Sequence, residues 1–402
     1  MLALEEARAR VLAAARPVGI EWLALPEALD RVLALDLVAR HDQPPVAVSA
    51  MDGYAVRAAD TEPAGRWLRL VGESRAGGPE PPALAPGEAV RIFTGAPLPP
   101  GADAIAIQEN AELADGRVRF TRPSRPGEFV RPAGLDFRTG SVGLSAGRVL
   151  DPRAIGLAAA LGHAWLPVRR KPRVAILATG DELLWPGEPV APGRVASSNS
   201  VALAALVRRL GGEPLDLGIA PDTADGLARA LDRLGAVDLL LTSGGASVGD
   251  YDLVRRVLGG RGLELDFWTV AMRPGKPLIF GRLADLPVLG LPGNPVSVLV
   301  CGIVFLRPLL LAMLGLETTL PVEQRPVLRD LPANDQRFDH LRARLLRRED
   351  GPAVEPFERQ DSSMLATLAA ADALILRPPH APPLPAGSPV PCVPLEVALR
   401  LP

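Results

Sequence analysis

A glycine-rich stretch between a strand-like segment and a helix-like segment is the clearest candidate for chemistry in this sequence. Residues 242–252 read Thr-Ser-Gly-Gly-Ala-Ser-Val-Gly-Asp-Tyr-Asp and follow the apolar run 237–241. Glycine lets a backbone approach a ligand closely, and the free N–H groups at a helix start attract anionic oxygen. The stretch therefore predicts a phosphate-binding turn built on Gly244, Gly245 and Gly249.

Two acids, Asp250 and Asp252, close this stretch. A carboxylate beside a bound phosphate repels it unless a divalent cation lies between them, and Mg²⁺ prefers oxygen ligands. We therefore expect magnesium here. The alternative is a tight strand-to-helix turn in which Asp250 caps the following helix.

Two other strand-like segments also end in glycine and acids. Gly180-Asp181-Glu182 follows the apolar run 174–178, and Asp222 follows the run 214–219. In an open α/β sheet, ligands bind beyond the carboxyl ends of the strands. We expect these acids to lie beside the glycine-rich turn.

Two rigid loops could bind anions in the same region. Arg273-Pro274-Gly275-Lys276-Pro277 holds two cations on a Pro/Gly backbone, which suits a phosphate or a small tetrahedral oxyanion, although a surface loop with solvated charges would also fit. The segment from Pro292 to Ser297, which includes Gly293 and Asn294, leads into an apolar helix with free N–H groups.

Polar residues near glycine also occur much earlier in the chain. Asp52 precedes Gly53, Thr94 precedes Gly95, and the segment 131–136 begins with Arg131 and ends with Asp136. Each of these segments would also fit a plain turn.

Composition limits the classes of function. The 402 residues include 44 Lys and Arg against 46 Asp and Glu, so the formal charge of -2 gives no global basic field for nucleic acid. Cys301 and Cys392 do not form a disulfide framework, which fits a reducing cytoplasm. The charged N-terminus does not resemble a secretory signal, and the longest apolar stretch, Val296–Leu306, is shorter than the ~17–25 residues of a membrane span. We expect no membrane partner.

The pattern of elements predicts a multidomain α/β plus β protein. Segments 1–40 and 137–170 predict a helical or extended linking domain, with helices over 2–15 and 26–39. Residues 41–136 predict an inserted small β domain. Residues 171–320 predict a central α/β domain with a parallel sheet, and residues 321–402 a C-terminal β-barrel or sandwich.

The motifs together resemble those of the molybdopterin molybdenumtransferase family, which includes bacterial MoeA and the E domain of gephyrin. The resemblance runs in order from about residue 2 to the C-terminus, and seven ordered motifs carry it. They are Ser-Ala-Met-Asp-Gly-Tyr-Ala (49–55), Phe-Thr-Gly-Ala-Pro (93–97), Arg-x-x-Gly-x-Asp (131–136), Thr-Gly-Asp-Glu-Leu (179–183), Ser-Gly-Gly-x-Ser-Val-Gly (243–249), Pro-Gly-Lys-Pro (274–277) and Leu-Pro-Gly-Asn-Pro-Val-Ser (291–297).

The resemblance implies a fold and a reaction. The α/β domain would be a molybdopterin-binding domain like those of MogA and MoaB, and the linking domain would be elongated. The family inserts molybdate into the dithiolene of adenylyl-molybdopterin with help from Mg²⁺, releasing AMP and forming molybdenum cofactor. Its members are homodimers whose site combines the α/β domain of one subunit with the inserted β domain of the other. Other molybdenum cofactor biosynthesis proteins remain open as partners.

The resemblance also assigns residues by motif match. The catalytic positions would be Asp52, Thr94, Asp136, Glu182, Asp222 and Asp252. Mg²⁺ would lie near Glu182, Asp250 and Asp252. The positions that bind the pterin nucleotide or the oxyanion would be Arg131, Gly180, Ser243, Gly244, Gly245, Ser247, Gly249, Arg273, Lys276, Pro292, Gly293, Asn294, Ser297, Arg342, Ser362 and Ser363. Arg273 stands where the motif more often has lysine, which keeps the charge but changes the hydrogen-bond geometry.

Three alternatives remain open. A molybdopterin adenylyltransferase shares the α/β domain, but its chains usually end after that domain. Tungstate matches molybdate in size and charge, so a tungstate-inserting homologue would have the same motifs. A non-catalytic scaffold of the gephyrin E-domain type would not need intact acid and glycine motifs.

Overall fold

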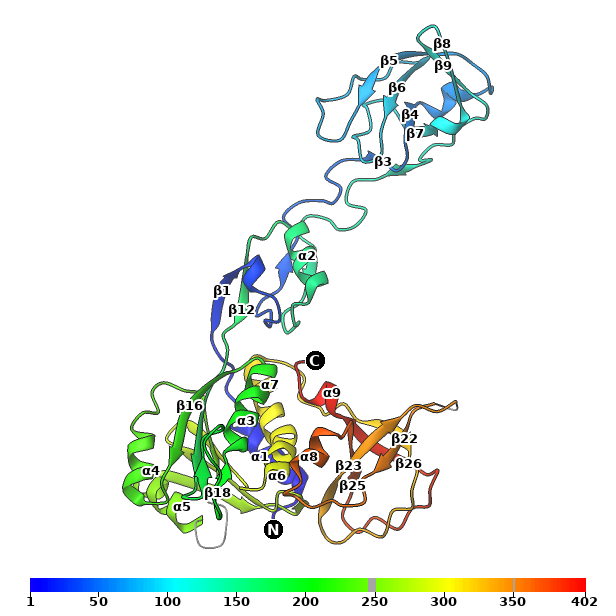
Figure 1. Ribbon diagram of the computed structural model, residues 1–402. Helices are drawn as coiled ribbons and strands as arrows, with labels where there is room; N and C mark the ends of the chain where they lie inside the picture. The colour runs from blue at the N-terminus through cyan, green and yellow to red at the C-terminus, as the bar shows by residue number, and fades with distance from the viewer. Residues whose placement is uncertain (245–250, 350) are drawn as a thin grey trace.

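The molecule is elongated, with a small β domain at one end and the α/β and C-terminal domains at the other (Figure 1). A computed structural model describes residues 1–244, 251–349 and 351–402, without the side chains of 251–255. The N-terminus, the α/β sheet and the C-terminal sheet lie at the broad end. Two chain segments run through the linking domain to the distal β domain and back.

A six-stranded sheet forms the centre of the α/β domain. In spatial order its strands are β16 (Glu213–Ala220), β13 (Arg173–Thr179), β17 (Leu239–Ser243), β21 (Leu286–Leu291), β20 (Pro277–Leu283) and β18 (Leu263–Thr269). The first four are mutually parallel, β20 runs antiparallel to both β21 and β18, and the carboxyl ends of β16, β13, β17 and β21 meet at one edge. The helices of the domain include α3 (Ser198–Arg209), α4 (Ala224–Leu231) and α5 (Tyr251–Gly260).

A long apolar helical segment crosses the core of this domain. It comprises α6 (Pro295–Cys301), the π-helical turn η4 (Gly302–Leu306) and α7 (Arg307–Leu314). It continues beyond the apolar stretch Val296–Leu306 and through Arg307-Pro308, with the proline in the first turn of α7. Among the described helices it is the one long and apolar enough to span a membrane, but 89% of its most apolar window is buried inside the protein, as expected for a core helix.

The N-terminal helix α1 (Leu4–Ala13) packs on this long segment. Its buried residues Leu4, Ala7 and Val11 belong to the same core cluster as Leu309 and Leu310 of α7. The first helix is therefore part of the broad end of the molecule, beneath the linking domain.

The linking domain is built from both passages of the chain. Strand β1 (Ile20–Ala24) pairs with β12 (Trp165–Arg169), and β2 (Leu37–Val38) pairs with β11 (Val142–Leu144). Helix α2 (Pro152–Ala160) begins after Asp151, whose side chain accepts a hydrogen bond from the Ala154 N–H.

The helix expected over 26–39 is wrong. Only the short 3-10 turn η1 (Leu25–Glu27) forms there, Asp30 has a φ of 60°, and Leu33 bridges to Val168 of β12. Pairing across the domain has overridden the helical spacing of the apolar residues.

The distal β domain contains a second six-stranded sheet. In spatial order its strands are β7 (Ala104–Ile107), β4 (Gly53–Val56), β6 (Glu88–Ile92), β5 (Leu68–Ser74), β9 (Arg117–Phe120) and β8 (Ala111–Ala114). The turns η2 (Ala58–Thr61) and η3 (Gln108–Asn110) connect strands, and β3 (Val48–Ser49) pairs with β10 (Val130–Arg131) where the chain enters and leaves.

The C-terminal domain is a small closed sheet, as the sequence predicted. Its spatial order is β19 (Met272–Arg273), β23 (Phe338–Leu346), β25 (Ala373–Arg377), β26 (Pro389–Pro394) and β22 (Glu323–Pro326), and β24 (Ala353–Pro356) also pairs with β23. Val327, directly after β22, bridges to Val354 of β24 and closes the barrel around an apolar core. The helices α8 (Leu365–Ala369) and α9 (Leu395–Ala398) lie on the side of the long helix.

Candidate functional site

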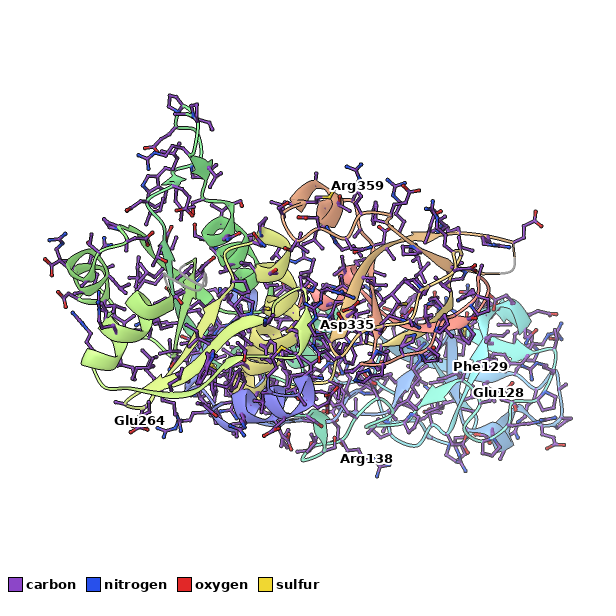
Figure 2. The ribbon with its side chains drawn as sticks, turned by 90° about the horizontal axis from the view of Figure 1, so that it is seen from below. Glu128, Phe129, Arg138, Glu264, Asp335 and Arg359 are labelled. Atoms are coloured by element: carbon purple, nitrogen blue, oxygen red, sulfur yellow. The ribbon has the colours of Figure 1, made fainter. Side chains whose placement is uncertain are left out.

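A pocket of about 520 Å³ lies at the carboxyl ends of the parallel strands, between the α/β and C-terminal domains. Figure 2 shows Asp335, whose side chain holds two of the pocket's arginines, where these two domains meet. The predicted site residues that line the pocket are Glu182, Gly244, Arg273, Lys276, Pro292, Gly293, Asn294, Ser297 and Ser362. Residues from five separate stretches of sequence are therefore brought together.

The end of β17 explains why glycine is required at position 244. Gly244 has a φ of +97°, and a Cβ there would lie 2.1 Å from the Thr179 carbonyl oxygen of the neighbouring strand. The hydroxyls of Thr179 and Ser243 are buried just before the pocket and have no hydrogen-bond partner among the described residues. The ends of β13 and β17 thus approach each other closely, and the hydroxyl groups of Thr179 and Ser243 lie beside the pocket.

The acids at the ends of β13 and β16 have two different environments. Asp181 Oδ1 accepts a hydrogen bond of 3.0 Å from the Asp222 N–H, and Asp222 Oδ2 accepts one of 3.2 Å from the Asp181 N–H. This reciprocal pair ties the two loops together. Glu182 instead lines the pocket, and its carboxylate lies over Gly180, where a Cβ would come within 2.6 Å of it.

The Arg-Pro-Gly-Lys loop begins in a strand of the C-terminal sheet. Arg273 pairs with Asp339 in the β19–β23 register, and its Nε donates to Asp339 Oδ1 at 2.8 Å while Nη2 donates to Oδ2. Hydrogen bonds to Asp339 raise the pKa of Arg273. Burial, partly offset by the hydrogen bonds from Arg273, raises the pKa of Asp339 above its ordinary value.

Lys276 differs from the two arginines that line the same pocket. Arg337 donates to Asp335 from its backbone and its side chain, which lowers the pKa of Asp335 to about 2. Arg273 also donates to Asp335 Oδ2, at 3.3 Å. Among the described residues lining the pocket, Lys276 is the cation without an acid partner.

The start of α6 is joined to the C-terminal domain by hydrogen bonds. Asn294 Nδ2 donates to Ser362 Oγ at 2.7 Å, and the Val296 N–H donates to the Ser362 carbonyl oxygen at 3.1 Å. The Asn199 side chain donates to the Gly293 carbonyl oxygen at 2.7 Å. These bonds bring Ser362 into the pocket beside Asn294.

Two predicted residues of the C-terminal domain do not line the pocket. Arg342 is buried at 1% exposure, and its guanidinium donates to Gln360 Oε1 at 3.2 Å and to the Met364 carbonyl oxygen at 3.3 Å. Ser363 donates to Asp361 instead, from its hydroxyl at 2.6 Å. Arg342 therefore holds Gln360, which does line the pocket.

The other predicted catalytic group lies at the far end of the molecule. Asp52 Oδ1 accepts hydrogen bonds from the Thr94 N–H at 2.7 Å and from its hydroxyl at 2.8 Å. These bonds, the backbone one first, lower the pKa of Asp52. Arg131 lies in β10, and Asp136 is exposed on the return to the linking domain. Within one chain, the linking domain separates this group from the pocket (Figure 1).

Several predicted positions lie outside the described residues: Gly245, Ser247, Gly249, Asp250 and the side chain of Asp252. Other pocket residues, namely Met272, Arg337 and Gln360, were missed. For Arg337 the sequence did carry a signal, because acids flank it at 335 and 339. For Gln360 nothing in residue type or spacing pointed to the site.

Comparison with known proteins covers nearly the whole chain. Three family models match: the MoeA N-terminal region (domain I and II) over residues 2–162, a probable molybdopterin binding domain over 175–312, and the MoeA C-terminal region (domain IV) over 324–395.

Individual relatives agree with the family models. The molybdopterin molybdenumtransferase of Bacillus subtilis is 34% identical over 93% of this chain and 90% of its own length, and that of Haemophilus influenzae is 38% identical over 78% of each. The molybdopterin biosynthesis MoeA protein of Pyrococcus horikoshii has two similar solved structures, with TM-scores of 0.87 and 0.82 at 31% and 28% identity. They cover 98% of this chain and 99% and 100% of their own. The chain therefore belongs to the MoeA family of molybdopterin molybdenumtransferases, enzymes of molybdenum cofactor biosynthesis.

Proposed function

We propose that this protein inserts molybdate into adenylyl-molybdopterin and releases AMP, in the cytoplasm. The observation that carries the proposal is the pocket, in which the glycine-rich strand end, Glu182, the Arg-Pro-Gly-Lys loop and the start of α6 face one volume. The glycine at position 244 lets the strand end approach a phosphate closely, and Lys276 suits an oxyanion.

The reaction needs charge stabilisation more than it needs a protein nucleophile. If an oxygen of molybdate attacks the adenylyl phosphorus, the P–O bond to the pterin phosphate breaks and molybdate becomes bonded to AMP; the two dithiolene sulfurs then bond to molybdenum and displace AMP and one oxygen, which leaves as water. If water attacks instead, AMP leaves directly, and the dithiolene sulfurs displace two oxygens of molybdate as water. Negative charge grows on the departing oxygen. Lys276, which lines the pocket, would stabilise that charge in a partly enclosed site.

Magnesium is part of the proposal, and the donor chemistry fits it. Mg²⁺ is usually held by one or two carboxylates, water and substrate phosphates, so a complete protein cage is not required. Glu182 offers an exposed carboxylate at the pocket, and among the described side chains, which exclude those of 245–255 and 350, no group of three or more acidic, histidine or cysteine residues forms such a cage. When bound, the ion would neutralise charge on the phosphate oxygens.

A homodimer would complete the site. Asp52 and Thr94 lie at the far end of the same chain from Glu182, so they would act on a ligand in the partner's pocket. The β1–β12 pair supports self-association, because Ile20, Trp22 and Trp165 are 45%, 59% and 58% exposed, and their register puts all three on one face.

The direct test is AMP release from adenylyl-molybdopterin, Mg²⁺ and either molybdate or tungstate, followed by chromatography. We expect release with molybdate and a loss of about 100-fold for Glu182→Gln. Glu213→Gln, at the amino end of β16, is the matched control and should keep wild-type turnover. Release with tungstate alone would favour the tungstate-inserting homologue, and none with either oxyanion would favour a scaffold.

A further inference from the structure

The Arg-Pro-Gly-Lys loop of the pocket is held from both sides by neighbours that the reaction itself does not require. On one side, the N–H of Phe338 donates to the Ala271 carbonyl oxygen at 2.9 Å, and β19 runs parallel to β23. On the other side, a Cβ at Gly275 would lie 2.5 Å from Cys301 Sγ of α6. The loop is thus clamped between the C-terminal sheet and the long helix, with Lys276 exposed at its end.

The guanidinium of Arg273 is already occupied within this clamp. Asp339 takes its Nε and one Nη2 hydrogen, while Nη1 reaches Asp335 at 3.3 Å and Nη2 also lies 3.4 Å from Asn334 Oδ1. A guanidinium fork matches a carboxylate with two parallel hydrogen bonds, which a lysine cannot reproduce. Asp339 is only 3% exposed, so removing its partner would leave a buried charge.

We propose that Asp339, supported by Asp335, is a positioning residue for the oxyanion: it engages the guanidinium of Arg273 and fixes the loop so that Lys276 is the cation left free to meet the ligand. Arg273 is then a structural link between two domains. Asp335 also pairs with Arg337, so both arginines of the pocket have acid partners and Lys276 has none among the described residues. This inference rests on the proposed function, because it names the group that meets molybdate.

The positioning role of Asp339 and direct ligand binding by Arg273 predict different changes in the KM for molybdate. Asp339→Asn frees the guanidinium and loosens the loop, so the KM for molybdate should rise about tenfold while the KM for adenylyl-molybdopterin changes less than about twofold. If Arg273 bound the oxyanion, freeing it would lower the KM for molybdate or leave it unchanged, and the proposal would be overturned.

A second variant shows whether the effect of Asp339→Asn comes from the lost ion pair or from a folding defect. Arg273→Lys keeps the positive charge but loses the fork, so it should raise the KM for molybdate as much as Asp339→Asn does, and the double variant should be no worse than either single one. A wild-type KM in Arg273→Lys would overturn the proposal. Thermal unfolding of each variant shows whether the fold is kept. Glu355→Gln, which breaks the Arg329–Glu355 pair of 2.9 Å elsewhere in the same domain, is the matched control.

Calorimetry with molybdate alone separates this inference from the proposed function. If the wild-type protein binds molybdate but releases no AMP, the proposed reaction fails, while weaker molybdate binding by Asp339→Asn still supports the positioning role. If the wild-type protein releases AMP and both variants bind molybdate as it does, the positioning role fails and the reaction stands.

Discussion

The pocket and the distal Asp52–Thr94 pair are held in place by different kinds of contact. At the pocket, parallel strand ends set the geometry, and the backbone is so crowded that a Cβ at Gly244 would overlap the Thr179 carbonyl group. At the distal pair, two hydrogen bonds from one residue hold a single carboxylate, and a Cβ at the adjacent Gly95 would meet nothing within 4 Å. One region is fixed by its own sheet, whereas the other is open on the side that would face a ligand.

The largest effect should come from variants that inactivate the pocket and the distal pair one at a time. Asp52→Asn and Glu182→Gln should each lose about 100-fold or more in AMP release if both regions serve one reaction. Dissociating the two variants and mixing them should restore about a quarter of wild-type turnover. Half of the proposed dimers would then be mixed, and in each mixed dimer one of the two sites would combine an intact Asp52 with an intact Glu182. No recovery on mixing would mean that the two regions do not meet across subunits.

Glycine substitutions test the difference in crowding. Gly244→Ala places alanine at a positive φ and also brings its Cβ into the backbone of the neighbouring strand. It should lower the free energy of unfolding by about 3 kcal/mol or more. Gly95→Ala, at a φ of +79°, adds only backbone strain and should cost about 1–2 kcal/mol. Urea unfolding of both variants measures this, and equal costs would contradict the contrast.

Acid should destabilise the pocket end of the molecule first. Burial lowers the pKa of His340 to about 4, opposed in part by a hydrogen bond with the Arg273 backbone and aided slightly by Arg8, and residues 42–136 contain no histidine. Since the unfolded histidine has a pKa near 6.5, the unfolded state takes up a proton first, and stability is lost as pH falls from about 6.5 towards 4. The loss between pH 7 and pH 5 should be about 2 kcal/mol by urea unfolding.

His340→Asn is the control for this pH effect. It removes the titrating group from β23, so the loss between pH 7 and pH 5 should largely disappear. An unchanged loss in this variant would assign the effect to other groups.

The smallest effect should appear at the distal pair. Thr94→Val removes the hydroxyl that donates to Asp52 and keeps the Thr94 N–H bond, which is the larger cause of the lowered pKa. The pKa of Asp52 should therefore rise only part of the way towards its ordinary value, as an NMR titration of the carboxyl carbon would show. A further fall in that pKa would contradict the hydrogen-bond explanation.

Most of the pocket was predictable because its residues obey local rules. Apolar runs predicted the parallel strands, and glycine with acids at their ends predicted the shared edge. The engagement of Arg273 with Asp339 was not predictable, because the partners come from different domains and the choice between ligand and protein partner leaves no local pattern. The burial of Arg342 and the loss of the helix over 26–39 were missed for the same reason: distant residues decided them.

The packing of α1 on α7 has a consequence for how the protein is made. A ribosome releases α1 first, but Leu4, Ala7 and Val11 find their partners only after residues 307–314 have been translated. The strands of the distal sheet, by contrast, all lie between residues 53 and 120 and pair among themselves. Because closing a long loop costs more entropy than closing a short one, the nascent chain should complete its distal domain while the apolar face of its first helix is still uncovered, a natural point for a chaperone to bind.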